Sequence, residues 1–381
     1  MATPWPGQRT GIADYAYDLA AGMVAQGHKL TVVTTASPPR PLSGVSFLTP
    51  EDYSVAHHSE MDQLVYHLGN NSNFHIFQLP MLVRFPGVVH LHDMVLHHLM
   101  AWILVVHAKA PFYRRAVARW YGPAVAELAE RRIATAEPLW NSQFAVDVPM
   151  FEEPLQYAIG LVTNSRFACE RVKARFPGLP ALVVPQLYRD GVVRQERATR
   201  PFYIGVFGGV APNKQVDVVI EACRQLVASG HSIELHITGK VEEVSRPLID
   251  ALMAGDLALY TQLHGYTEHD DFLARMAQMD VCVALRNPTM GETSAIAMRA
   301  LQSGVPVIVS DVGWYRELPD FVTKLPLDKD LATVRLTQTL GRLIDDPSAH
   351  DALASTTRSY AQSELNFEAV ISEYCAFLSQ S

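Results

Sequence analysis

The sequence has few cysteines, no long apolar run and no cluster of positive charge, and each shortage argues against a class of protein. Its four cysteines are far apart and form no C-x-x-C pair, which argues against a disulfide framework or a zinc knuckle and fits a reducing compartment. The longest apolar stretch, Met100–Val106, is far shorter than the about 20 residues that a membrane-spanning helix needs. The Pro-rich first residues do not resemble a signal peptide. We therefore expect a cytoplasmic protein with at most peripheral contact to the inner face of a membrane.

Charge, length and composition argue against further classes of protein. Lys and Arg number 31 against 39 Asp and Glu, a net charge of −8 without a basic block, which is unfavourable for binding nucleic acid. The 381 residues suit two domains rather than one. With 49% hydrophobic and 18% charged residues, a disordered or low-complexity chain is excluded.

Short β-branched runs alternate with helical patterns along the chain. Most runs are continuously apolar, which is typical of parallel strands covered by helices on both faces. The clearest helix is predicted over Gln215–Ser229, ended by Gly230. The predicted strands are Lys29–Thr35, Phe74–Leu79, Val88–Asp93, Leu161–Ser165, Ala181–Gln186, Tyr203–Gly208, Ile233–Gly239, Val281–Leu285 and Pro306–Asp311.

This series runs twice and predicts an α/β chain of two Rossmann-like domains, residues 1–190 and 201–364. The polar stretch Tyr188–Pro201 is the predicted linker, and residues 365–381 are a predicted helix that returns to the first domain. The helical segment Leu96–Ala136 has no counterpart in the second half. Two interpretations of it stay open: a solvated amphipathic helix, and a surface for an acceptor or a membrane.

The segment Arg286–Ala295 carries the strongest chemical signal. It follows a predicted strand and opens a helix, where free N–H groups bind anions at the carboxyl edge of an α/β sheet. Gly291 permits a close backbone approach, while Glu292, Thr293 and Ser294 suit a phosphate and sugar hydroxyls. Simple capping of the helix is the alternative interpretation.

Two further loops have the same position relative to a strand and a helix. Gly208 and Gly209, with Lys214 behind them, offer backbone donors and a point charge to a diphosphate, and a solvated lysine at a helix start is the alternative. They form neither a Walker A loop nor G-x-G-x-x-G. The loop Gly7–Tyr15, which contains Gly11, opens the first helix and is weak evidence alone.

Together these loops resemble the retaining, nucleotide-sugar-dependent glycosyltransferases called group 1 or family 4. The best-matching pieces are Thr10–Tyr15 with Gly27–Thr34, Phe207–Gly209 with Pro212–Lys214, Gly291–Ser294 with Gly304–Val307, and His90–Asp93. The resemblance implies a GT-B fold of two facing Rossmann-like domains with a C-terminal helix that crosses back. It also implies a nucleoside diphosphate sugar as co-substrate, no other cofactor and no metal.

The resemblance assigns roles to individual residues. Lys214 and the Gly291–Ser294 amides stabilise the departing diphosphate, and Glu292 holds hydroxyls of the transferred sugar. His92 lies near the reaction centre, with Asp93 orienting its ring. The implied donor-binding residues are Gly11, Gly208, Gly209, Lys214, Arg286, Gly291, Glu292, Thr293, Ser294 and Arg299. The implied acceptor is a glycan, a lipid-linked molecule or a small molecule.

The chain departs from this family pattern in three places. Arg299 stands where the second glutamate of an acidic pair is expected, and Gly209 stands where an arginine is common. The third departure is the absence of an apolar first strand, because Met1–Gly7 is rich in Pro and Gly. We expect the natural start to lie upstream, or the chain to be truncated or mis-started, since a missing central strand leaves two internal edges unpaired.

Other functions keep the same fold. A catalytically silent GT-B protein that serves as a partner or sensor is favoured by Arg299 and by the missing strand. An epimerase or phosphorylase changes the reaction only. The histidines His90, His92, His97 and His98 could suggest a metal, but no cysteine or acidic cluster supports such a site.

Overall fold

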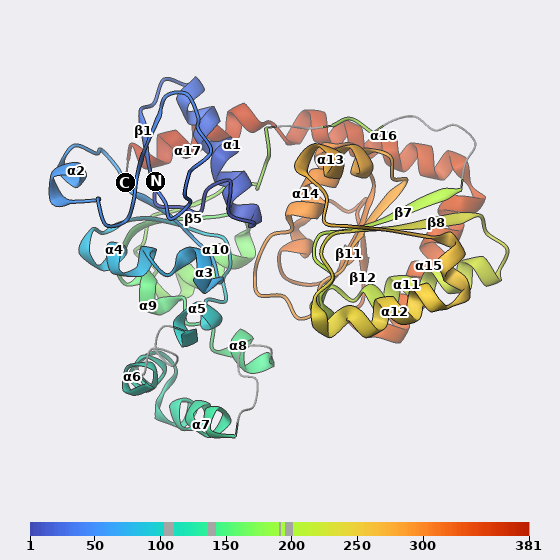
Figure 1. The fold of residues 1–381 in the computed structure, drawn as a ribbon, viewed down its shortest axis with the longest axis horizontal. Coiled ribbons are helices and arrows are strands. Elements are labelled where there is room, and N and C mark those ends of the chain that lie inside the picture. Colours follow the sequence, from blue (N-terminus) through green and yellow to red (C-terminus); the bar gives the residue numbers. More distant parts are fainter. Residues whose placement is uncertain (103–109, 136–141, 190–191, 195–200, 381) are drawn as a thin grey trace. The chain divides into compact units, whose positions relative to one another are not determined.

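The computed structural model describes residues 1–102, 110–135, 142–189, 192–194 and 201–380 (Figure 1). The chain divides into two compact units. The first comprises Met1–Arg189, Met290–Thr293 and Phe367–Ser381, and the second comprises Asp190–Thr289 and Ser294–Asn366. The short loop Met290–Thr293, which the sequence analysis placed with the second domain, therefore packs with the first unit. Most of the predicted linker falls outside the described residues.

The first unit contains parallel sheets. β1 (Leu30–Val33) pairs with β2 (Val45–Leu48), and a four-stranded sheet has the order β3-β4-β5-β6. Its strands are β3 (Val65–Leu68), β4 (Gly87–Leu91), β5 (Ala158–Thr163) and β6 (Ala181–Val183). The buried β3 and β4 have apolar or histidine side chains on both faces, as expected for strands between two helical layers.

Met1–Thr3, which we call the amino-terminal bridge, connects these two sheets. Ala2 pairs in parallel with Val33 of β1 and with Tyr66 of β3. The Ala2 N–H donates to the Val65 carbonyl at 2.7 Å, and the Val33 N–H donates to the Met1 carbonyl at 2.8 Å. No strand precedes the first helix in the described residues. The bridge instead occupies part of the position expected for the absent first strand, and it joins two sheet edges that we expected to be unpaired.

Helices cover the sheets of the first unit. α1 begins after Thr10, whose side chain accepts from the Ile12 N–H, and α17 packs against it, with Gln26 Nε2 donating to Ser372 Oγ at 2.9 Å. The predicted C-terminal helix is thus confirmed within the first unit. The helices are α1 (Gly11–Ala25), α2 (Val55–Ser59), α3 (Ser72–His75), α4 (Gln78–Arg84), α5 (His97–Ala101), α6 (Ala110–Tyr121), α7 (Pro123–Ala134), α8 (Gln143–Asp147), α9 (Glu152–Leu155), α10 (Arg166–Arg175) and α17 (Phe367–Leu378).

Two sequence predictions for the first unit need correction. The strand predicted over Phe74–Leu79 is wrong, because this segment lies in α3 and α4; its apolar run belongs to two short helices, a case in which periodicity alone does not decide. The segment Leu96–Ala136 contains three helices rather than one, and residues 103–109 lie outside the described part. On α6, Phe112 is exposed while Tyr113 is buried against His97.

The second unit contains one six-stranded parallel sheet with the order β12-β11-β10-β7-β8-β9. Its strands are β7 (Phe202–Phe207), β8 (Ile233–Thr238), β9 (Thr261–Gly265), β10 (Val281–Ala284), β11 (Val307–Ser310) and β12 (Thr323–Leu325). The sequence analysis missed the sheet's two outer strands, β9 and β12. β9 exposes Gln262 and Leu263, so it lacks a continuous buried run.

The helices of the second unit follow its strands in alternation. α11 buries Val216, Val219, Ile220, Cys223 and Leu226 against the sheet, as the periodicity predicted. The helices are α11 (Val216–Ala228), α12 (Arg246–Ala254), α13 (His269–Ala277), α14 (Ala295–Gln302), α15 (Lys329–Asp345) and α16 (Pro347–Glu364), with short 3-10 turns η2 (Pro212–Lys214), η3 (Glu243–Ser245), η4 (Asp256–Tyr260) and η5 (Gly313–Glu317). None of the helices in the described residues has the length and apolarity needed to span a membrane.

A buried ion pair fixes the beginning of β10 in the second unit. Asp280 is fully buried, lies 3.4 Å from Arg194 Nη2, and accepts the Tyr203 N–H at 2.7 Å. Arg194 in turn donates its backbone N–H to Ser303. Because both charges are out of water, loss of one leaves the other uncompensated.

We therefore expect Arg194→Ala to lower the free energy of unfolding by about 3 kcal/mol. The control is Arg224→Ala, which removes an exposed arginine that pairs with Glu221 and should change stability by less than about 1 kcal/mol. Urea unfolding of both variants measures the difference. Equal losses would contradict the importance of the buried pair.

Candidate functional site

The strand order in the sheet of the second unit reverses between β7 and β10. From β7 the chain proceeds to β8 and β9 on one side, and from β10 to β11 and β12 on the other. The loops that leave two adjacent strands at such a point diverge and leave a crevice at the carboxyl edge, where ligands of open α/β sheets bind. The predicted residues Gly208, Gly209 and Lys214 follow β7, and Arg286 follows β10.

The loop after β7 folds back over its own strand end. Gly208 has a positive φ of 86°, and its N–H donates to the Thr238 carbonyl at 2.9 Å. A Cβ at Gly208 would lie 3.1 Å from Lys214 Nζ and 3.6 Å from Ile296 Cγ1 of α14. The lysine ammonium therefore lies directly over Gly208 and beside the first turn of α14. The positive φ favours glycine at this position, and a Cβ would press against the tip of the lysine side chain.

Two hydrogen bonds donated by backbone N–H groups hold the neighbouring strand ends together. The Asn287 N–H donates to the Asn213 carbonyl at 2.8 Å, which ties the loop after β10 to the loop after β7. The Arg286 N–H donates to Ser310 Oγ at 2.9 Å, which ties it to the end of β11. The positions of Lys214 and Arg286 thus depend on three adjacent strand ends, so the second unit presents two cationic side chains at one edge.

The amino end of α14 supplies the third component of this edge. Ser294 is its N-cap, and its Oγ accepts the Ala297 N–H at 3.2 Å, so the capping interpretation is correct for this residue. The remaining first-turn N–H groups have no partner within the helix and carry partial positive charge. Arg299 is buried in α14, five residues beyond the cap and about 7 Å along the axis. Backbone donors, Lys214 and the helix dipole together suit an anion.

The loop Met290–Thr293 is described with the first unit. The Val95 N–H donates to the Met290 carbonyl at 2.9 Å, and a Cβ at Gly291 would lie 2.5 Å from Met94 Cβ. Glu292 accepts the Met290 N–H at 2.7 Å, which fixes this carboxylate against its own loop. Thr293 donates to Gln186. Gly291 and Glu292 thus lie against the segment that follows β4, which also carries His92.

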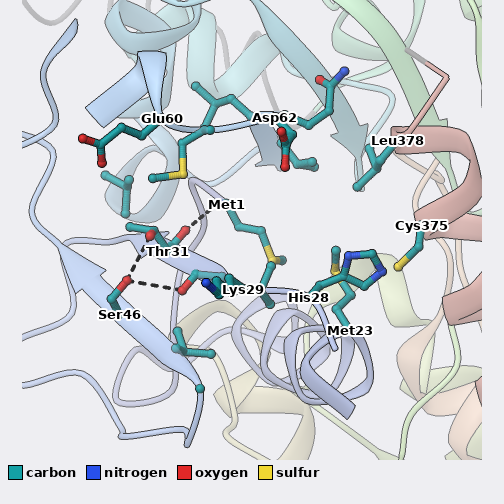
Figure 2. Close-up of a pocket in the computed structure, with 18 of the residues that line it drawn as sticks. Met1, Met23, His28, Lys29, Thr31, Ser46, Glu60, Asp62, Cys375 and Leu378 are labelled. Carbon is teal, nitrogen blue, oxygen red and sulfur yellow. Dashed lines mark hydrogen bonds between the residues drawn. The ribbon is translucent and has the colours of Figure 1, made fainter. Parts of the chain in front are cut away.

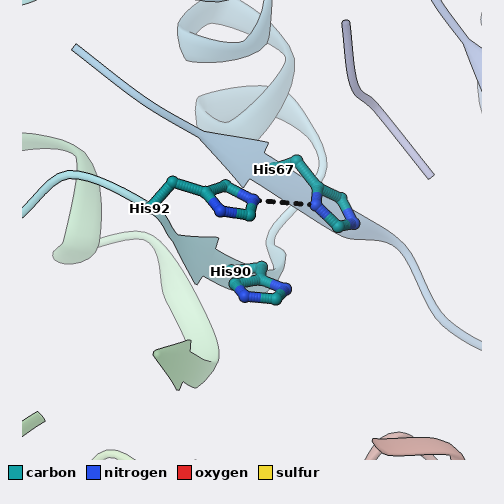
Figure 3. Close-up of side chains that lie close together, drawn as sticks. All are labelled: His67, His90 and His92. Atoms are coloured by element: carbon teal, nitrogen blue, oxygen red, sulfur yellow. Dashed lines mark hydrogen bonds between the residues drawn. The ribbon is translucent and has the colours of Figure 1, made fainter. Parts of the chain in front are cut away.

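His92 belongs to a buried cluster that the sequence only partly revealed. Its Nε2 lies 3.0 Å from His67 Nδ1, and its ring stacks on His90 with 4.3 Å between the centroids (Figure 3). Sequence analysis missed His67 because it overlooked β3, although the apolar run before Gly69 was a usable signal. His97, which was grouped with this set, instead contacts the Val148 carbonyl and Tyr113.

Hydrogen bonds fix the protonation of His90. Asn164 Nδ2 donates to the Val184 carbonyl, so its Oδ1 accepts from His90 Nε2 at 3.1 Å. His90 Nδ1 then accepts from the Tyr374 hydroxyl at 3.2 Å. Burial lowers the pKa of His90 to about 3, and burial with the neighbouring histidines lowers the pKa of His67 and His92 well below the ordinary value. All three rings are therefore neutral near pH 7.

The three rings have nitrogens within 4.8 Å of one another, a spacing that a metal could bridge. Two of the three ring pairs are nearly parallel, however, with angles of 15° for His90 and His92 and 23° for His67 and His92, while His67 and His90 are tilted by 36°. A ring nitrogen binds through a lone pair in the ring plane, and stacked rings do not aim their lone pairs at one point. We interpret the cluster as a neutral hydrogen-bonded network that fixes the His92 ring.

Comparison with known proteins was made against families, curated proteins and solved structures. Residues 201–346, less than half of the chain, match the family described as Glycosyl transferases group 1. Among curated proteins, none matches this chain by sequence.

Solved structures share the fold, and the first two described here match it over the whole chain. The structure of Anabaena Alr3699/HepE in complex with UDP is 14% identical with a TM-score of 0.64, and the match covers 100% of this chain and 99% of that one. WaaG, a glycosyltransferase involved in lipopolysaccharide biosynthesis, is 15% identical with a TM-score of 0.62 and 100% coverage of both chains. The pneumococcal O-GlcNAc transferase GtfA is 15% identical with a TM-score of 0.51, covering 59% of this chain and 46% of that one.

These findings confirm the resemblance that the motifs predicted. The chain has the GT-B fold, and residues 201–346 match the group 1 glycosyltransferase family. The chain spans the full length of HepE and WaaG but less than half of GtfA.

The geometry of Gly291 generates one prediction. We expect Gly291→Ala to destabilise the protein more than Gly230→Ala, because both positions have a positive φ but only Gly291 has a neighbour in the way. Gly230→Ala should cost about 1 kcal/mol from backbone strain alone, and Gly291→Ala about 2 kcal/mol more from the contact with Met94. Urea unfolding measures both, and equal losses would show that the loop moves aside freely.

The buried histidines generate a pH prediction. In the unfolded chain these histidines bind protons below about pH 6.5, whereas in the folded chain they stay neutral. Their contribution to the free energy of unfolding is therefore complete above about pH 6.5 and decreases as the pH falls. Burial lowers the pKa of His97 to about 4. His97→Gln should therefore reduce the slope of unfolding free energy between pH 6 and 4.5 by about 1 kcal/mol per pH unit. The exposed His269→Gln is the control and should leave the slope unchanged.

Proposed function

We propose that this protein transfers a sugar from a nucleoside diphosphate sugar to an acceptor hydroxyl with retention of configuration, in the biosynthesis of a glycan or glycoconjugate. The observation that carries the proposal is the placement of Lys214 Nζ over Gly208 and beside the first turn of α14. This position is the point at which the strand order of the sheet reverses. A diphosphate at this edge would meet backbone donors, a helix amino end and an ammonium group.

Catalysis depends on stabilising charge that develops on the leaving group. As the bond between the anomeric carbon and the diphosphate breaks, negative charge grows on the phosphate oxygens. Lys214 and the amide groups at the start of α14 then interact more strongly with the leaving group than with the intact donor. Arg286, held at the adjacent strand end by Ser310, adds a second positive charge.

Retention needs bond formation on the face that the leaving group vacates. Enzymes that retain configuration through a covalent intermediate use a carboxylate nucleophile. Glu292 is the acidic residue of the signature loop, and its carboxylate is engaged by the Met290 N–H, which suits a role in holding sugar hydroxyls. We therefore propose a front-face displacement: the acceptor oxygen bonds to the anomeric carbon, the diphosphate leaves, and a phosphate oxygen takes the acceptor proton.

His92 contributes as a neutral group in this proposal. Because burial keeps its ring uncharged, it can hydrogen-bond a sugar hydroxyl as a neutral partner. Its network partners His67 and His90 fix the ring orientation. The proposal includes no metal and no cofactor other than the donor itself.

Uridine diphosphate sugars are the first donors to test. HepE has been crystallised with UDP and with UDP-glucose. For the acceptor we propose a glycan, a lipid-linked molecule or a small molecule bound by the first unit. The exposed Phe112 and the arginines of α6 offer a surface for such a molecule.

A silent sugar-nucleotide-binding protein is the second candidate. It is favoured by Arg299, a buried cation at the position where the family resemblance leads us to expect an acid. Such a protein would bind the donor without turnover. Release of nucleoside diphosphate that depends on an acceptor distinguishes the two.

Lys214→Ala provides the test. We expect nucleoside diphosphates, with UDP tested first, to raise the unfolding temperature of the wild-type protein, since a ligand that binds only the folded state stabilises it. Lys214→Ala should remove most of this shift and reduce kcat by about 100- to 1,000-fold, because it deletes a charged donor to the leaving group. Lys214→Arg should restore part of both.

The control is Arg342→Ala, which removes one positive charge from the exposed last turn of α15 in the same unit. It should leave binding and turnover unchanged. Addition of a chelator should not reduce the rate. A thermal shift without acceptor-dependent product in the wild-type protein would favour the silent protein, and no shift with any nucleotide would contradict both candidates.

A further inference from the structure

Gln186 lies in the first unit, just beyond the carboxyl end of β6, and its side chain is buried. Two hydrogen bonds hold the backbone of this segment against the end of β5. The Val184 N–H donates to the Thr163 carbonyl at 3.0 Å, and Asn164 Nδ2 donates to the Val184 carbonyl at 3.1 Å. The segment that carries Gln186 is therefore fixed beside Asn164, which also hydrogen-bonds the buried histidine cluster.

The side-chain amide of Gln186 uses both of its ends. Its Oε1 accepts the hydroxyl of Thr293, and its Nε2 donates to the Tyr188 hydroxyl at 2.7 Å. Gln186 is only 6% exposed, so water offers little replacement for either partner. The amide thus connects the loop Met290–Thr293 to the segment that follows β6.

Tyr188 continues this connection toward the histidine cluster through aromatic contacts. Its ring meets the Tyr15 ring edge-on, with 6.0 Å between the centroids and 78° between the planes. The Tyr15 ring in turn lies edge-on to His92, with 5.4 Å between the centroids. Both tyrosines are almost completely buried, so these rings have little freedom to move. Gln186 therefore stands between the loop that carries Glu292 and the rings packed around His92.

The loop Met290–Thr293 is attached both before and after Glu292. Before it, the Met290 N–H donates to the Glu292 carboxylate at 2.7 Å, and the Met290 carbonyl accepts the Val95 N–H. After it, the Thr293 hydroxyl donates to Gln186. Because Thr293 directly follows Glu292 in the chain, its position limits where the Glu292 carboxylate can lie. Gln186 supplies the attachment on this side.

We propose that Gln186 is a positioning residue for the transfer reaction, which acts through Thr293 to hold Glu292 in place for the hydroxyls of the transferred sugar. This inference rests on the proposed function, in which Glu292 binds the sugar and Lys214 binds the diphosphate. Gln186 serves the sugar part of the donor alone. Its loss should therefore weaken binding and turnover that depend on the sugar, and should leave the affinity for the nucleoside diphosphate unchanged.

The first experiment compares UDP with UDP-glucose on the full chain, by calorimetric titration and by initial rates. Gln186→Leu keeps a similar volume and removes the amide. We expect it to raise the Kd of UDP-glucose and lower kcat/KM for this donor by about 10-fold each, with less than about 2-fold change in the Kd of UDP. If UDP causes no thermal shift, another nucleoside diphosphate and its sugar take its place.

Thr293→Val tests the same hydrogen bond from its other side. It removes the hydroxyl donor at nearly constant volume, and it should reproduce the difference between UDP and UDP-glucose even if Gln186→Leu does not fold. In the Thr293→Val background, Gln186→Leu should have no further effect on kcat/KM, which a double-mutant cycle measures. Thr293→Ser keeps a hydroxyl and should retain most of the wild-type rate.

Two control variants remove hydrogen bonds elsewhere in the chain. Gln225→Leu is matched in chemistry, because Gln225 Oε1 accepts the Thr337 hydroxyl at 3.0 Å between α11 and α15. Ser46→Ala lies in the first unit and removes the hydrogen bond of 2.9 Å between Ser46 Oγ and Thr31 Oγ1, in the wall of a separate cavity of about 700 Å³ (Figure 2). Both should leave the Kd of UDP-glucose and kcat/KM unchanged.

Three results would overturn the inference while the proposed function stands. They are an unchanged Kd of UDP-glucose and kcat/KM in Gln186→Leu, an equal loss of affinity for UDP and UDP-glucose, and additive losses in the double variant. An equal loss for both ligands would show a general effect on the fold. Wild-type protein that binds no nucleoside diphosphate would contradict the proposed function itself, and this inference with it.

Discussion

The adjacency of β7 and β10 is the constraint on which the candidate site depends. Parallel pairing of these strands places their carboxyl ends side by side, although about 75 residues separate them in the sequence. The loop after β7 brings Lys214 back over Gly208, and the loop after β10 leads to α14. Neither loop alone is distinctive, as the weak individual motifs indicated. Only their combination at the carboxyl ends of β7 and β10 forms a site that suits an anion.

The first unit contains buried polar side chains that need hydrogen-bond partners within the protein. His67, His90 and His92 lie among buried aromatic rings, and their hydrogen bonds to one another, to Asn164 and to Tyr374 satisfy much of their polar character. Because α17 supplies Tyr374, this helix helps to organise β4, which carries His90 and leads directly to His92. A neutral, well-oriented imidazole is the result.

Much of this architecture could be predicted from the sequence because it rests on local patterns. Continuous apolar runs identified β4, β5, β7, β8, β10 and β11, and the strand-to-helix turns identified Lys214 and the segment around Gly291. The failures have physical causes. Phe74–Leu79 has strand-like composition but forms short helices, β9 exposes part of its surface, and β3 was overlooked together with His67. The pairing of Met1–Thr3 with two strands could not be predicted, because the hydrogen bonds of a three-residue segment depend on strands that are distant in the sequence.

The path of the chain between the two compact units has a consequence for dissection of the protein. It passes from one unit to the other after Arg189, Thr289, Thr293 and Asn366. A single cut near residue 190 would therefore leave the amino-terminal piece without α17 and without Met290–Thr293, so that Tyr374 would be missing beside His90 and the Met290 carbonyl beside Val95. Separate expression of the halves would leave the first core incomplete, whereas the second half would keep its whole core and carry α17 without its packing partners. An autonomous first unit would need its carboxyl-terminal helix restored by circular permutation.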